Sequence, residues 1–370
     1  MGRTTGSGER RTTHRTHRWR RALLATVITG AVVVPLSGAA RAEIPAPAPA
    51  ALAPLSAATL DETYEANRAN AAEASRMAAA HGNRDRAAAD RAMADPSRRF
   101  LAFDGRGLGL ATEVFGDLAH ADRIAVLVPG SDTSIDTYDR FRDTARALHD
   151  RLTREAPQGT RTAVVAWLGY ETPGTVSTTV ATMGRADDAA PKLREFIRQL
   201  RALTIDERTG ATRATRATRV TGEAGASGEA GEAGARRATG ADEGRPRISL
   251  LCHSYGSVVC ARAVSDLDVD DIALVGSPGT GVDTAAGLDT RARVWAARGT
   301  DDWVGEVPHV RLDLLGTTVG FGTDPISPSF GARVFTAGDG GHSDYFRPGS
   351  TSLANLARIV LGETSEVTHG

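Results

Sequence analysis

The sequence predicts an α/β fold in which a mostly parallel sheet carries helices on both faces. Two observations lead to this fold class. Short, continuous apolar runs, for example residues 124–128 and 162–168, have the composition of strands that are buried on both faces. Stretches with apolar residues at helical spacing, such as residues 138–152, lie between these runs. Strands that alternate with helices in this way form βαβ units.

The other elements of the main domain follow the same reasoning. A hairpin is expected at residues 100–104 and 108–114, where a Gly-containing turn separates two short apolar runs. A second helical stripe extends from Leu193 to Leu203. In the C-terminal half we expect strands at residues 248–252, 272–275, 294–297 and 333–336, and a final helix at residues 352–361.

Residues 59–98 are rich in Ala, Glu and Arg and therefore have high helix propensity. Because large apolar side chains are few there, we expect one or two helices that pack weakly on the main domain, residues 99–363. A coiled-coil partner surface is the alternative, but the heptad pattern is not sustained. A Pro/Ala-rich linker at residues 43–58 precedes this helical segment.

An insert at residues 209–246 interrupts the main domain. Ala-Thr-Arg and Gly-Glu-Ala triplets recur in it, and Val220 is its only large apolar residue. Such a segment buries too little apolar surface to offset its ordering entropy, so we expect disorder. A tolerated surface loop fits this composition better than a binding tail.

Residues 1–42 are expected to be a secretory signal peptide. Several Arg residues precede the apolar stretch at residues 22–40, and Ala40, Arg41 and Ala42 form an A-x-A cleavage signal. The mature protein is then expected to be secreted into an oxidising environment. The alternative is an uncleaved segment that anchors the protein in the membrane, which Pro35 and the small-residue ending disfavour.

The composition excludes several classes of partner and cofactor. The formal net charge is −1, so no bulk field attracts nucleic acid. No zinc-ligand spacing and no phosphate-binding Gly loop with Lys occurs in the sequence, so we expect no metal and no cofactor. The acidic run at residues 266–271 resembles the start of a calcium loop, but Asp271 and Ser277 stand where that loop needs Gly and Glu.

The motif with the clearest chemistry is Cys-His-Ser-Tyr-Gly at residues 252–256. It follows an expected strand and precedes a small-residue helical pattern, which is the setting of a nucleophile elbow. Such an elbow holds its central residue, here Ser254, in a strained turn with the hydroxyl clear of the sheet. Strand and helix nearly touch at this point, so the flanking residues must be small, as Cys252 and Gly256 are.

The two cysteines of the chain leave one disulfide open, and export would favour it. Cys252 ends a strand, whereas Cys260 lies more than a turn into the next helix. This placement puts their Cα atoms beyond the roughly 7 Å that a disulfide can bridge. Two small buried thiols are therefore the favoured interpretation.

A serine hydroxyl becomes a nucleophile when a base removes its proton and a carboxylate orients that base. His342 follows the last expected strand and is the expected base. The adjacent His253 is expected to point elsewhere, into the core or the rim of the site. Asp302, favoured over Asp301, lies just past the strand at residues 294–297, on the edge of the sheet where ligands bind.

Two backbone amides are expected to form an oxyanion hole. One is the amide of Tyr255, directly after Ser254. The other is the amide of Ser131, in the loop after the first parallel strand, where Gly130 lets the chain turn and borders the substrate. Tyr170, at the end of the next strand, is expected to line the substrate pocket.

These motifs together resemble the alpha/beta-hydrolase superfamily, and more closely an actinobacterial branch of it that is defined only as a domain of unknown function. The resemblance implies that fold and a triad of Ser254, Asp302 and His342, and it supplies no substrate. The chain departs from this branch at Cys252, where Gly is usual. The matching stretches are residues 126–130, 166–170, 253–257, 274–279 and 341–342.

The sequence thus leads us to expect a secreted serine hydrolase that acts on small-molecule carboxylic esters through an acyl-enzyme. The connection at residues 277–291 is too short for a lipase lid, whereas that at residues 303–333 is long enough to cover the site. Peptidase or thioesterase activity remains open, because a triad does not select the leaving group. A non-catalytic cell-envelope binding protein on a hydrolase scaffold is the other alternative.

Overall fold

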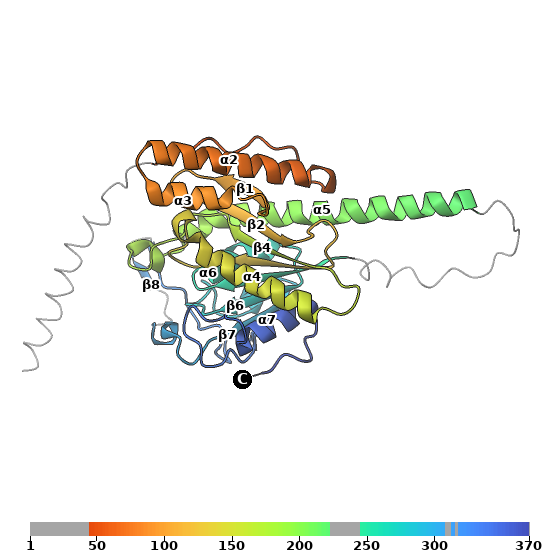
Figure 1. The fold of residues 1–370 in the computed structure, drawn as a ribbon. Helices are drawn as coiled ribbons and strands as arrows, with labels where there is room; N and C mark the ends of the chain where they lie inside the picture. Colours follow the sequence, from red (N-terminus) through yellow and green to blue (C-terminus); the bar gives the residue numbers. More distant parts are fainter. Residues whose placement is uncertain (1–43, 223–244, 308–311, 315–316, 370) are drawn as a thin grey trace, which may run out of the picture. The chain divides into compact units, whose positions relative to one another are not determined.

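The computed structural model describes residues 44–222, 245–307, 312–314 and 317–369. The expected signal peptide lies outside these residues. The centre of the described part is an eight-stranded sheet with the strand order β1-β2-β4-β3-β5-β6-β7-β10 (Figure 1). Its strands are β1 (Phe100–Asp104), β2 (Leu110–Gly116), β3 (Arg123–Val128), β4 (Thr162–Leu168), β5 (Arg247–His253), β6 (Asp271–Val275), β7 (Arg293–Ala297) and β10 (Arg333–Val334).

The pairing of the strands confirms a mostly parallel sheet. β1 and β2 form the expected antiparallel hairpin, and β2 is antiparallel to β4. The remaining strands pair in parallel. β10 is shorter than the strand expected at residues 333–336, because Phe335 forms an isolated bridge with His369 instead. A separate antiparallel pair consists of β8 (Leu312–Leu314) and β9 (Thr317–Val319).

Helices cover both faces of the sheet, as predicted. α4 and α7 pack on one face, and α5 and α6 pack on the other (Figure 1). Consecutive strand residues point alternately into the two cores. Val126 faces the α5–α6 side and Leu127 faces the α4–α7 side. None of the described helices is both long and apolar enough to cross a membrane. The helices are α2 (Leu60–Ala80), α3 (Arg84–Met93), α4 (Tyr138–Glu155), α5 (Gly184–Gly222), α6 (Gly256–Ala263) and α7 (Thr351–Leu361).

The N-terminal helices are built into the main domain, so the expectation of weak packing is wrong. α2 packs on the edge strand β1, where Asn67 donates a 2.9 Å hydrogen bond to the carbonyl of Phe100. Arg86 of α3 is only 2% exposed, and its guanidinium donates to Asp136 and to the carbonyl of Gly105. Small Ala side chains allow close approach, and buried hydrogen bonds supply the specificity that large apolar residues would otherwise provide.

The long helix α5 corrects the prediction for the insert. It extends to Gly222 and therefore includes residues 209–222, for which disorder is the sequence-based expectation. Ala and Arg, which recur in this segment, are strong helix formers, and a helix that is already nucleated by packed turns can propagate through them. The rest of the insert up to residue 244 lies outside the described residues.

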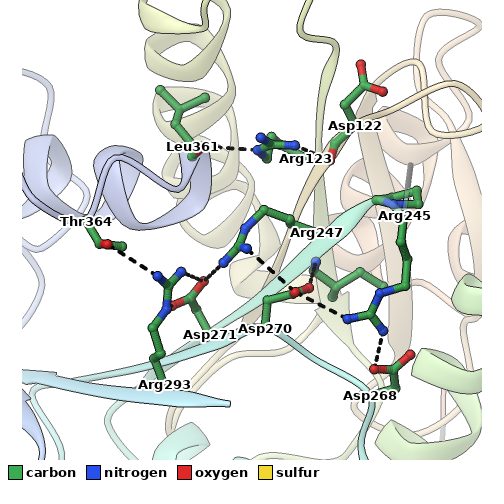
Figure 2. A network of polar contacts seen from close by, with 12 residues as sticks. Asp122, Arg123, Arg245, Arg247, Asp268, Asp270, Asp271, Arg293, Leu361 and Thr364 are labelled. Atoms are coloured by element: carbon green, nitrogen blue, oxygen red, sulfur yellow. Dashed lines mark hydrogen bonds and ion pairs between the residues drawn. The ribbon is translucent and has the colours of Figure 1, made fainter. Parts of the chain in front are cut away.

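An ionic network joins the amino-terminal ends of the central strands (Figure 2). Asp271, at the start of β6, is fully buried. Its carboxylate accepts two hydrogen bonds of 2.7 Å from Arg293, one of 2.9 Å from Arg247 and one of 2.9 Å from the indole of Trp295. Arg side chains also pair with the other acidic residues of this run. Guanidinium groups thus engage the carboxylates that mimic a calcium loop.

We expect the substitution Asp271→Ala to lower the free energy of unfolding by about 3 kcal/mol, because it removes the acceptor of the buried Trp295 indole and of two partly buried guanidinium groups. Chemical denaturation of both proteins measures the difference. Asp150→Ala is the matched control, since this exposed α4 carboxylate makes only loose surface pairs and should change stability by less than about 0.5 kcal/mol. Equal stability of Asp271→Ala and Asp150→Ala would show that the network does not stabilise the sheet.

Candidate active site

The turn between β5 and α6 forms a strained elbow. Ser254 lies in this turn with a φ of +54°, in the left-handed region that is unfavourable for a residue with a side chain. A Cβ atom at position 256 would lie 2.5 Å from the carbonyl oxygen of Val128, so only Gly256 fits there. The strand–turn–helix geometry therefore agrees with the predicted elbow and places Ser254 at its tip.

Cys252 and Cys260 form a disulfide, so the preference for two free thiols is wrong. The helix begins immediately after the elbow and turns back over the end of β5. Consequently the two Cα atoms are 6.5 Å apart, within the range that a disulfide can span. Ser254 lies inside the closed ring, which restricts the conformations open to the elbow.

His342 lies between Ser254 and Asp302. Its Nε2 is 2.9 Å from Oγ of Ser254, and its Nδ1 is 2.9 Å from Oδ1 and 3.1 Å from Oδ2 of Asp302. The carboxylate accepts a hydrogen bond from the protonated Nδ1, so Nε2 carries the lone pair that faces the hydroxyl. The three side chains come from the loops after β5, β7 and β10, and together they can take a proton from Ser254.

The carboxylate of Asp302 has two further donors. The amide of Val304 donates to Oδ1 at 2.9 Å, and the hydroxyl of Tyr345 donates to Oδ2. Burial acts to raise the pKa of Asp302, but the hydrogen bonds from His342, Tyr345 and Val304 outweigh it and hold the pKa below its ordinary value. Asp302 is therefore ionised when His342 accepts a proton.

His253 lies at the rim of the site and contacts the backbone of His342. Its Nε2 donates a 2.7 Å hydrogen bond to the backbone carbonyl of His342, and the two rings are 4.8 Å apart. Burial, followed by the charge of His342, lowers the pKa of His253 to about 4. A neutral His253 can thus fix the backbone that carries the base without adding a charge next to it.

The loop after β3 approaches the elbow closely. A Cβ atom at Gly130 would lie 2.6 Å from Cβ of Ser254, so glycine is required for this contact. Two amides further along this loop are anchored. The amide of Asp132 donates to the carbonyl of Pro173 at 3.0 Å, and the amide of Thr133 donates to the hydroxyl of Thr172 at 3.0 Å.

The amide of Ser131, directly before these anchored residues, has no hydrogen-bond acceptor within the described part of the chain. The same holds for the amide of Tyr255, which directly follows Ser254. Both predicted oxyanion-hole amides are therefore available next to the nucleophile candidate.

Comparison with known proteins agrees with this geometry. A family model described as "Alpha/beta hydrolase" matches residues 104–213 and 212–312, which is more than half of the chain. The chain belongs to the alpha/beta hydrolase family. Residues 104–312 contain the elbow and Asp302, whereas His342 lies beyond the matched stretch.

The hydrolase is also similar to individual proteins. An uncharacterized protein of Mycobacterium tuberculosis strain H37Rv is 27% identical over 290 residues, which cover 71% of this chain and 38% of that protein. The chain thus spans well under half the length of this relative.

Among solved structures, a predicted CIB-like hydrolase from Thermoplasma acidophilum has 16% identity and a TM-score of 0.37, with 72% of this chain and 96% of that chain covered. A lidless serine hydrolase from Xanthomonas campestris has 13% identity and a TM-score of 0.36, with 73% and 95% covered.

A pocket of about 330 Å³ opens above Ser254 and His342. Gly130 and Ser131 are among the residues that line it. Arg140 and Phe141 of α4 also line it, as does Trp303, whose ring lies next to that of His342. Within the described residues, no group of three or more His, Cys, Asp or Glu side chains could hold a metal ion.

Tyr170 does not line this pocket, so that prediction is wrong. Its side chain is only 2% exposed, stacks on Trp167 and donates a 2.7 Å hydrogen bond to the carbonyl of Pro129. The chain turns inward after β4, which buries the ring against the α5 side of the sheet. Tyr170 therefore braces the loop that carries Gly130.

Two residues of the site, Tyr345 and Trp303, were not predicted. Tyr345 follows His342 by three residues and reaches back to Asp302. Trp303 directly follows Asp302, and its ring lies 4.8 Å from that of His342. Their proximity in sequence to the base and the acid is the only signal that points to them, because neither belongs to a spacing motif.

We expect the stability of the hydrolase to fall between pH 6.5 and pH 4 because of His253. Its folded-state pKa of about 4 lies below the ordinary 6.5, so in this window the unfolded chain binds a proton that the folded chain does not. Urea unfolding of the wild type and of His253→Gln at several pH values measures this, and the wild type should lose up to about 3 kcal/mol relative to the variant. The exposed His81→Gln is the control. Parallel pH curves for the wild type and His253→Gln would contradict the assignment.

Proposed function

We propose that this protein is a secreted serine hydrolase that cleaves carboxylic esters through an acyl-enzyme. The observation that carries the proposal is the hydrogen-bonded series from Ser254 through His342 to Asp302. The strained backbone at Ser254 and the two available amides beside it support the same reading. A structural role accounts poorly for strain, an aligned base and unpaired amides at one point.

In the proposed acylation step, Oγ of Ser254 attacks the ester carbonyl carbon while Nε2 of His342 takes the hydroxyl proton. The electron pair of the carbonyl moves onto its oxygen, which the amides of Ser131 and Tyr255 stabilise. The carbonyl then re-forms and the bond to the alcohol oxygen breaks. This oxygen receives the proton from His342, so the alcohol leaves and an acyl-Ser254 ester remains.

Deacylation repeats these steps with water as the nucleophile. His342 takes a proton from water as its oxygen attacks the acyl carbon, and the same two amides hold the oxyanion. When the intermediate collapses, Oγ of Ser254 leaves and regains the proton from His342. The ionised Asp302 stabilises the imidazolium in both steps, and its lowered pKa keeps it charged.

The form of the pocket supports a small ester over a peptide. Its volume of about 330 Å³ is at the low end of the roughly 300–1,000 Å³ typical of small-molecule sites. Its lining residues surround one compact space beside Ser254, whereas a peptidase needs subsites along an extended chain. Thioesters share the acyl chemistry and are distinguished by the assay below.

Export is the second part of the proposal. The basic and apolar segments before Ala42 support it, and so does the disulfide between Cys252 and Cys260, since stable disulfides belong to oxidising compartments. The same environment would place the substrate outside the cytoplasm.

We expect a fluorophosphonate probe to label the purified wild type and to fail with Ser254→Ala and His342→Ala. Hydrolysis of phenyl acetate should fall at least 10³-fold in both, and about 10²- to 10⁴-fold in Asp302→Asn, because the members of a triad act as a unit. Parallel assays with the phenyl thioacetate and the acetanilide identify the preferred leaving group. Ser265→Ala, an exposed serine outside the pocket, and His81→Ala should label normally.

A wild type that stays unlabelled under conditions that label a control hydrolase would refute the triad assignment. The non-catalytic binding scaffold would then be the better description. Labelling that persists in Ser254→Ala would place the nucleophile elsewhere.

For export, we expect a secretion-competent bacterial host to release a protein whose first residue is Glu43, because cleavage follows Ala42. Mass spectrometry of the secreted protein reads its N-terminus, and alkylation before and after reduction counts the thiols. Ala40→Leu with Ala42→Leu should block cleavage. Recovery of the intact wild-type chain in the membrane fraction would favour the anchored alternative.

A further inference from the structure

Trp303 is an unusual aromatic residue in this protein. Its side chain is 49% exposed, although the other large aromatic side chains near the site, such as Phe141 and Phe346, are buried. Its indole N–H has no acceptor within the described part of the chain. Since it lines the pocket next to the candidate base, its exposed face is available to a bound molecule.

The position of Trp303 is rigidly defined by the triad itself. It is the first residue of a short helix, Trp303–Glu306, whose N-cap is Asp302. The carboxylate that orients His342 also accepts from the amide of Val304, which is 1% exposed. The backbone that carries Trp303 is therefore held beside His342, and the two ring centroids are 4.8 Å apart.

The chemistry of the proposed reaction assigns sides to the pocket. Nε2 of His342 must deliver its proton to the leaving oxygen, so the alcohol portion of the ester lies next to His342. The oxyanion lies toward the amides of Ser131 and Tyr255. The rest of the pocket, whose lining includes Phe141 of α4, is left for the acyl group.

The acyl group has limited room. Leu127, Leu251 and Phe141 line the pocket and are all buried in the core on the α4–α7 side of the sheet. With about 330 Å³ in total, the pocket accepts a short acyl chain. The alcohol portion, in contrast, lies against Trp303, whose side chain is 49% exposed.

We infer that Trp303 is a specificity-determining residue that binds the alcohol portion of the substrate, and that this portion carries a ring with a flat apolar face. This inference rests on the proposed function and names its substrate class: short-chain acyl esters of aryl alcohols or of sugars. Both kinds of ring stack on an indole, and the free N–H can donate to a sugar hydroxyl. A linear alkyl alcohol makes little use of this face.

The test compares three acetates that share one acyl group: ethyl acetate, phenyl acetate and an O-acetylated methyl glucoside. Trp303→Ala should lower kcat/KM for the preferred ring ester about tenfold more than for ethyl acetate, mainly through KM, because stacking aids binding more than the chemical step. Trp303→Phe should retain most of the activity on phenyl acetate. For each ester, kcat/KM of the variant is divided by kcat/KM of the wild type. This ratio cancels the intrinsic reactivity of the leaving group.

Val176→Ala is the matched control, because Val176 is an 82% exposed apolar residue that does not line the pocket. It should leave all three ratios near one. In the wild type, phenyl acetate should be a better substrate than phenyl octanoate, because the pocket of about 330 Å³ has little room for a long acyl chain. The ring ester with the larger dependence on Trp303 identifies the aryl or the sugar chemistry.

An equal loss on ethyl acetate and on both ring esters would overturn the inference, because Trp303 would then act only by positioning His342. So would unchanged kinetics on both ring esters. The rate of fluorophosphonate labelling reports the state of the triad in each variant. A wild type that neither labels nor hydrolyses any ester contradicts the proposed function itself, whereas an active wild type without a ring preference contradicts only the role of Trp303.

Discussion

The buried carboxylate of Asp302 is the interaction on which the rest of the site depends. It accepts hydrogen bonds from His342, Tyr345 and the amide of Val304, which come from two different loops. A buried carboxylate is costly unless its oxygens accept hydrogen bonds, so these donors stabilise the ionised Asp302 as well as orient it. The same bonds that hold the base also fix the backbone beneath Trp303.

The two ends of the parallel sheet differ: one carries a stabilising ionic network, and the other carries the candidate active site. At the amino-terminal ends of the strands, Asp271 and its arginines form an ionic network in which both carboxylate oxygens of Asp271 accept hydrogen bonds (Figure 2). At the carboxyl ends, the loops converge on Ser254, whose backbone is strained and whose neighbouring amides are left without partners. Strain at one end is tolerated because the core between the helix layers and the opposite network hold the strands in register.

Second-layer contacts give the site its rigidity. His253 bonds to the carbonyl of His342, Tyr170 to that of Pro129, and the disulfide of Cys252 and Cys260 encloses the elbow. Each of these residues lies beside a residue of the expected triad or oxyanion hole, in sequence or in space. These contacts keep Ser254, His342 and the loop of Gly130 at fixed distances, which the proposed general acid–base catalysis requires.

The sequence by itself determined the order of strands and helices along the chain and the position of the elbow. It also singled out Ser254, Asp302 and His342 as candidate site residues. These follow from local signals, because apolar runs, small flanking residues and strand-end positions are visible along the chain. Only the tertiary structure decided that Cys252 and Cys260 meet, that Tyr170 turns into the core, and that Tyr345 and Trp303 join the site. These outcomes depend on how loops from distant strands fold back on one another, and a linear pattern carries no information on that approach.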